Sequence, residues 1–179
     1  PVGSYWLQAG TVKASALLGR RQAGTRISAY RVPSLFGAIG AVLLTYWTAL
    51  TFVSRRASVV AAVMMAACVL LGVEARLAKT DAVLLFTVVA AMGAMARVYL
   101  NRLDAWPGWQ RQLLLPLIFW GALALGVLVK GPLILLIVGL SALTLCILDR
   151  SARWLLGLKP LIGVPVFLAL VLPWFLAIY

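Results

Sequence analysis

Long apolar runs alternate with short polar stretches along this chain of 179 residues. Runs of about 17–25 apolar residues cross a bilayer as α-helices. These runs do not alternate between apolar and polar positions, as the strands of a membrane barrel do. The pattern therefore predicts six membrane-spanning helices, at residues 32–53, 57–73, 82–100, 112–129, 131–148 and 161–179.

The first 31 residues follow a different pattern. They mix polar and apolar positions, with Tyr5 and Trp6 near the start and five basic residues. The segment is too polar to span a bilayer, so we expect an amphipathic helix on the membrane surface, followed by a basic loop. The fourth and fifth predicted spans are separated only by "VKGP", where Gly131 permits a tight turn and Pro132 can open the next helix.

Composition supports an all-α polytopic membrane protein. The chain is 64% hydrophobic and 11% charged, whereas a soluble domain is nearer 25% charged. The net charge of +12 does not indicate nucleic-acid binding, because the basic residues form short clusters between apolar runs. They are interpreted as anchors at the membrane surface. Cys68 and Cys146 lie inside apolar runs and are interpreted as packing residues, and the chain has no histidine.

The stretch "EARLAKTD", residues 74–81, gathers charged residues between two apolar runs. Arg76 and Lys79 are three positions apart, so on a helical turn they point the same way. Thr80 or Asp81 can cap the next helix. Two interpretations stay open and are compatible: a charged helix corner that anchors the chain, or a site for an anionic headgroup such as a phosphate.

The distribution of basic residues does not decide the orientation. The side that carries residues 1–31, 74–81 and 130 holds eight Lys and Arg residues, and the other side also holds eight. Without residues 1–31, the side of residues 74–81 and 130 holds three Lys and Arg residues and the other side holds eight. This distribution favours a cytoplasmic location for that other side. Arg97 lies near the end of the third predicted span, from where we expect it to reach the interface.

Four motifs occur in order: "PVGSYWLQAG", "RVPS" before a span, "EARLAKTD" and "VKGP". Together they resemble the protein mannosyltransferase-like membrane glycosyltransferases of the GT-C fold, and most closely the branch that includes the lipid A aminoarabinose transferase. That branch has a "KPP-x-x-YW" stretch, an Arg-Leu…Thr-Asp stretch and a "KGP" stretch. This chain has Val2 and Gly3 where the pattern has Pro-Leu.

The resemblance implies an enzyme that moves a sugar from a polyprenyl-phosphate donor to a lipid A-like or protein acceptor. It places residues 1–31, 74–81 and 130 on the periplasmic side of a bacterial inner membrane. The substrate-binding residues expected from it and from the charge pattern are Arg76, Lys79, Asp81, Lys130, Tyr5 and Trp6. No cofactor or metal is expected, because the basic side chains would neutralise the donor phosphate.

The resemblance also implies a catalytic acidic pair upstream of Pro1. We therefore expect the chain to be a fragment of a longer protein and to be inactive alone. The alternative function is a secondary transporter or a flippase for lipid-linked sugars. The pattern disfavours that alternative, because no predicted span carries a charge in its interior. A non-enzymatic structural subunit is the third interpretation.

Overall fold

The computed structural model describes residues 2–17, 27–100 and 108–178, and within these ranges every regular element is a helix. This confirms the predicted all-α fold class. The elements are α1 (Val2–Leu17), α2 (Ile27–Ala49), α3 (Arg55–Ala66), α4 (Val69–Arg76), α5 (Asp81–Tyr99), α6 (Gly108–Lys130), α7 (Leu133–Asp149), the short 3₁₀ helix η1 (Arg153–Leu158) and α8 (Pro160–Ile178).

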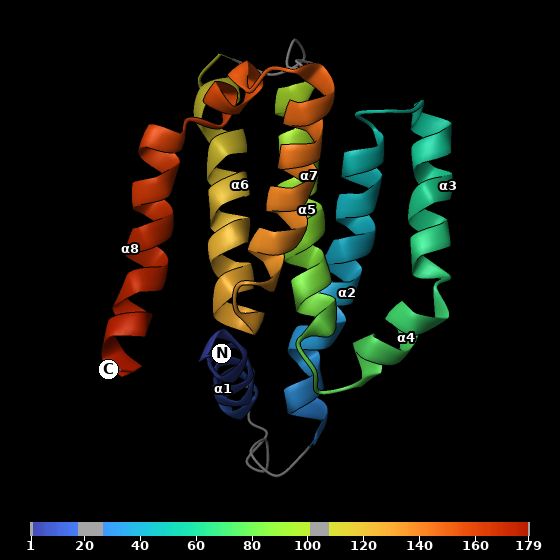
Figure 1. Cartoon of the computed structure of the whole chain (residues 1–179). Coiled ribbons are helices and arrows are strands. Elements are labelled where there is room, and N and C mark those ends of the chain that lie inside the picture. The colour runs from blue at the N-terminus through green and yellow to red at the C-terminus, as the bar shows by residue number, and fades with distance from the viewer. Residues whose placement is uncertain (1, 18–26, 101–107, 179) are drawn as a thin grey trace.

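The long helices form a bundle with α5 at its centre. Helix α5 packs against α2 on one side and α6 on the other, while α3 covers α2 and α8 covers α6. Figure 1 shows α1 across the lower end of this bundle, where it contacts α2 and α6. The corner between α4 and α5 and the turn between α6 and α7 lie at the same end.

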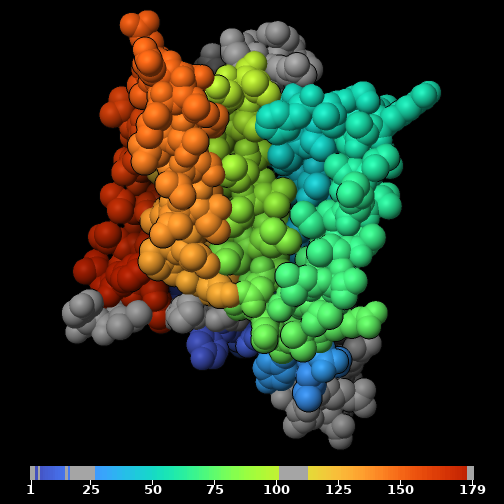
Figure 2. Space-filling model, turned by 45° about the vertical axis from the view of Figure 1, so that its right-hand side comes forward, coloured from blue at the N-terminus to red at the C-terminus, as the bar shows by residue number. Residues whose placement is uncertain are grey.

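Apolar side chains fill the bundle and also cover its outside. Met95 on α5, Leu115 on α6 and Ile134 on α7 are buried in the main cluster. In contrast, Leu136 and Leu161 point outward and are 64% and 91% exposed. Figure 2 shows α7 and the α3–α4 segment on either side of α5. Many of the exposed side chains of these outer helices are large and apolar, which suits contact with lipid.

The described helices provide fewer full-length spans than the six predicted from sequence. Three segments are long enough and apolar enough to cross a bilayer: α2, α5 and residues 113–130 of α6. Helix α7 and residues 160–176 of α8 are apolar but shorter. At 1.5 Å per residue, 17 residues reach about 25 Å, slightly less than the hydrocarbon core of about 30 Å.

The second predicted span, residues 57–73, is not one continuous helix. It is divided into α3 and α4, which meet at an angle of 56° and together would make a fourth span. The backbone N–H of Ala67 closes α3 on the carbonyl of Val63 at 2.8 Å, and Cys68 is extended. The bend brings Leu71 into a small buried cluster with Ala38 on α2 and Ala82 on α5.

Arg97 does not reach the membrane interface, contrary to the expectation from the sequence. Its side chain is 7% exposed, and its guanidinium lies 3.5 Å from the ring centroid of Trp47 on α2. It donates hydrogen bonds to the carbonyl of Gly93, at 3.2 Å, and to the carbonyl of Trp47. The charge is therefore buried between α2 and α5, because an aromatic face and two carbonyl groups replace water around it.

Candidate functional site

The charged stretch predicted from sequence forms a corner at the lower end of the bundle. Helix α4 ends at Arg76, Leu77 is extended, and α5 begins at Asp81. Because the helix ends between them, Arg76 and Lys79 do not share a helical turn, which corrects the expected i, i+3 arrangement. Thr80 occupies the N-cap position of α5, but its side chain makes no capping hydrogen bond.

Two other helices hold this corner in place. The hydroxyl of Ser34 on α2, which is 1% exposed, donates to the main-chain carbonyl of Lys79. The side-chain amide of Gln8 on α1 lies 3.5 Å from the carbonyl of Ala78, at the limit of a hydrogen bond. Sequence patterns could not indicate these partners, because they lie far from the corner along the chain.

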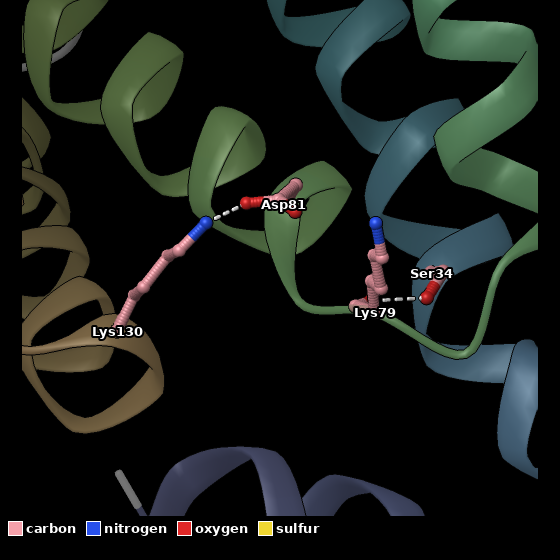
Figure 3. A network of polar contacts seen from close by, with 4 residues as sticks. All are labelled: Ser34, Lys79, Asp81 and Lys130. Atoms are coloured by element: carbon pink, nitrogen blue, oxygen red, sulfur yellow. Dashed lines mark hydrogen bonds and ion pairs between the residues drawn. The ribbon is translucent and has the colours of Figure 1, made fainter.

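Asp81 and Lys130 form an ion pair across the end of the bundle. Figure 3 shows Lys130, at the end of α6, reaching the carboxylate of Asp81 at the start of α5. The side chain of Lys130 is 39% exposed and that of Asp81 is 35% exposed. Gly131, with φ of +82°, ends α6, and Pro132 precedes α7, as the "VKGP" pattern predicted. Asp81 also lies in the first turn of α5, where the helix dipole favours a negative charge.

Arg76 and Lys79 remain available to a ligand. Both side chains are exposed. Among residues 2–17, 27–100 and 108–178, neither is paired with a carboxylate, and Figure 3 draws no contact to the Lys79 amine. Within the described ranges, the corner therefore presents two exposed cations without a carboxylate partner, and the charge of Lys130 is balanced by Asp81. This arrangement can bind an anion such as a phosphate.

Glu74 lies at the same corner, although sequence reasoning did not list it among the expected site residues. One of its carboxylate oxygens, Oε2, is buried and has no hydrogen-bond partner in the described part of the chain. Glu74 and Asp81 both line a cavity of about 240 Å³ beside the corner, whose other walls are apolar except at Cys68. The only signal in the sequence was an acid that directly follows the apolar run "LLGV".

Tyr5 and Trp6 lie on α1 but not at the ion pair. Tyr5 is 69% exposed and Trp6 is 60% exposed. The Trp6 ring makes an edge contact with Trp174 on α8, at 6.0 Å between centroids. These two predicted residues are therefore at the same end of the bundle as the corner, and Trp6 faces α8.

No curated protein and no solved structure matches this chain significantly. A profile of the dolichyl-phosphate-mannose-protein mannosyltransferase family, in contrast, matches residues 2–179. This match covers nearly the whole chain, and it agrees with the order of motifs found in the sequence. The protein therefore belongs to the dolichyl-phosphate-mannose-protein mannosyltransferase family.

Proposed function

We propose that this protein is a membrane glycosyltransferase that takes its sugar from a polyprenyl-phosphate donor, and that the corner at residues 74–81 binds the donor phosphate. The family is one of membrane mannosyltransferases, which supports the reaction class. The acceptor is a lipid A-like glycolipid or a protein, and the corner lies on the periplasmic side of a bacterial inner membrane.

The observation that carries this proposal is a pair of exposed cations at one corner, neither of which has a carboxylate partner in the part of the chain that the structure describes. Arg76 and Lys79 are exposed, and the backbone between them and α5 is held by Ser34. When the sugar leaves the donor, negative charge grows on the phosphate while the anomeric carbon becomes oxocarbenium-like. Cations that are already in position stabilise this charge without reorganisation at the moment of reaction.

Asp81 has a supporting part in this proposal. Its carboxylate holds the Lys130 amine at the start of α5, so that the third cation stays near the corner. An arriving phosphate can share Lys130 with Asp81, because a lysine amine has three donor hydrogens. Glu74 Oε2 has no hydrogen-bond partner among the described residues, which supports a role in accepting a hydrogen bond from a sugar hydroxyl.

Replacement of Arg76 tests the proposal. In the full-length protein, Arg76→Ala should lower transfer by about 2–4 kcal/mol of transition-state stabilisation, or about 30-fold to 1,000-fold in rate. Arg76→Lys should restore part of the loss, because a point charge cannot replace a planar fork. The measurement is donor turnover in membranes at matched protein levels, together with binding of polyprenyl phosphate to the purified protein.

Arg55 provides the matched control. It is an exposed arginine in the first turn of α3, at the opposite end of the bundle. Arg55→Ala should leave turnover and binding unchanged. If Arg76→Ala also keeps wild-type turnover and binding, the corner is only a membrane anchor.

A further inference from the structure

We propose that an anionic phospholipid binds at the end of the bundle opposite the charged corner, with an acyl chain in an apolar groove and its phosphate on a basic turn. The groove lies between α6, α7, η1 and the start of α8 and has a volume of about 360 Å³. It is called the α7 groove below, and its lining residues include Trp120, Leu123, Leu135, Gly139, Ala142 and Leu158. The inference goes beyond the proposed function and does not depend on it.

The α7 groove follows one face of α7. Leu135, Val138, Gly139 and Ala142 all line it, and their spacing of three and four residues places them on the same side of a helix. At 1.5 Å per residue, this stretch of α7 is about 10 Å long. The lining carries no charged side chain, and the indole N–H of Trp120 already donates to the carbonyl of Leu158 at 2.9 Å. The groove therefore suits a hydrocarbon chain that runs along the helix.

A basic turn adjoins this groove. Helix α7 ends at Asp149, and the chain continues through η1 to the start of α8. Figure 1 shows this turn at the end of the bundle opposite the corner between α4 and α5. Arg150 and Arg153 are exposed and Lys159 is half-exposed. In the part of the chain that the structure describes, no ion pair joins these three cations to a carboxylate.

The basic residues lie next to the groove lining along the chain. Arg153 precedes Leu155 by two residues, and Lys159 stands between Leu158 and Pro160, all of which line the groove except the two cations. The hydrogen bond from Trp120 fixes η1 to α6. On the other side, Gly157 lies so close to α5 that an added Cβ atom would be 2.6 Å from Val98 Cγ1. The cations are therefore carried by a segment that is packed against two helices.

Two of these basic residues have a backbone conformation that favours glycine. Arg150 has φ of +50° and Lys159 has φ of +47°, and among the described residues they are the non-glycine positions with positive φ. A side chain with a Cβ atom makes this left-handed conformation unfavourable. The turn itself would be better formed by glycine or asparagine. The basic side chains therefore point to a role beyond the turn.

The combination of groove and turn identifies the occupant. A phospholipid joins an apolar chain to a phosphate, so one molecule can fill the groove and reach the cations. An arginine fork binds phosphate oxygens and a lysine amine adds a point charge. A zwitterionic lipid also carries an ammonium group, which the same cations repel. Basic residues beside a membrane segment favour anionic lipids for this reason. The occupant that fits is an anionic diacyl phospholipid.

Lipid selectivity tests the inference. The full-length protein is released from micelles that contain phosphatidylglycerol and phosphatidylcholine with identical acyl chains, and bound lipid is measured by native mass spectrometry. The wild type should retain phosphatidylglycerol preferentially. Removal of one cation should weaken its binding by about 5-fold, so Arg153→Gln with Lys159→Asn should weaken it by about 10-fold to 30-fold. Asparagine is chosen because it tolerates positive φ. Binding of phosphatidylcholine should not change.

Arg55 and Arg56 provide the charge control. Both are exposed, in the first turn of α3 at the same end of the bundle. Arg55→Gln with Arg56→Gln removes the same charge and should leave the preference for phosphatidylglycerol unchanged. An equal loss in the two double variants would overturn the proposal, because total charge would then explain the selectivity.

A second variant tests the groove. Gly139 is exposed, and a Cβ atom there would meet no atom within 4 Å, so Gly139→Leu should fold and fill the groove. It should weaken phosphatidylglycerol binding by about 5-fold or more, whereas Leu140→Phe should not, because Leu140 is 60% exposed and is not among the lining residues. Unchanged binding in Gly139→Leu would overturn the groove assignment. Competition by glycerol 3-phosphate as strong as that by the lipid, or a protein dimer that Gly139→Leu abolishes, would assign the site to a soluble anion or to a second copy instead.

Discussion

Replacement of Gly37 by alanine should destabilise the bundle, because α2 and α5 meet there backbone to backbone. A Cβ atom at Gly37 would lie 2.8 Å from the backbone nitrogen of Val83 and 2.9 Å from the carbonyl carbon of Ala82. Ordinary contacts between carbon atoms are about 3.5–4.0 Å, so the two helices would have to separate by roughly 0.7–1 Å. Backbone atoms cannot rotate aside as a flexible side chain can.

The expected loss follows from two opposing terms. Overpacking of a core costs about 1–3 kcal/mol, and the upper part of this range applies because the obstacle is backbone. Alanine in place of a helical glycine returns about 0.5–1 kcal/mol. Gly37→Ala should therefore lower the free energy of unfolding by about 2 kcal/mol. It should also weaken donor binding, because Ser34, one turn away on α2, holds the corner at Lys79.

The assay is unfolding by titration with a denaturing detergent in mixed micelles, followed by tryptophan fluorescence. Gly139→Ala on α7 is the matched control, because a Cβ atom there would meet no atom within 4 Å. That variant should be as stable as the wild type or more stable by about 0.5–1 kcal/mol. Equal stability of the two alanine variants would refute the close approach of α2 and α5.

Two further predictions concern topology and charge. After both native cysteines are replaced, Ala78→Cys should react with an impermeant thiol reagent from the periplasmic side, and Ser54→Cys only from the cytoplasmic side; reaction of both from one side contradicts the proposed orientation. Asp81→Lys and Lys130→Asp should each lower stability by about 0.2–1 kcal/mol, the range for an exposed pair, and the double variant should recover it. A coupling energy of zero in the double-mutant cycle would show that the pair contributes nothing to stability.

The helices could be predicted because the length of each apolar run can be counted in the sequence. The turn at Gly131 and Pro132 was equally readable, since it depends on the backbone freedom of one residue and the fixed φ of the next. The break between α3 and α4 was not readable. Residues 57–73 are uniformly apolar except for Ser58, and the bend is stabilised by Leu71 packing against other helices, which is a tertiary effect.

The candidate site was predictable only in its charges. A cluster such as Arg76, Lys79 and Asp81 between apolar runs is visible at once, because ionised groups avoid the hydrocarbon core. The partners that position it were not visible. Ser34 resembles any small polar residue near the start of a span, and the pairing of Lys130 with Asp81 depends on how α5 and α6 meet.

The contact of Arg97 with α2 sets an order for the entry of the chain into the membrane. Insertion measurements place the cost of an arginine at the centre of a lone membrane helix at about 2.5–3.5 kcal/mol, and this cost falls toward the helix end. The guanidinium of Arg97 lies over the ring of Trp47 and donates a hydrogen bond to its carbonyl. Insertion of α5 therefore costs less free energy once α2 is in the bilayer. Helix α2 precedes α5 along the chain, so Trp47 is synthesised before Arg97. We therefore expect the two helices to enter the bilayer as partners, with the earlier one shielding the charge of the later one.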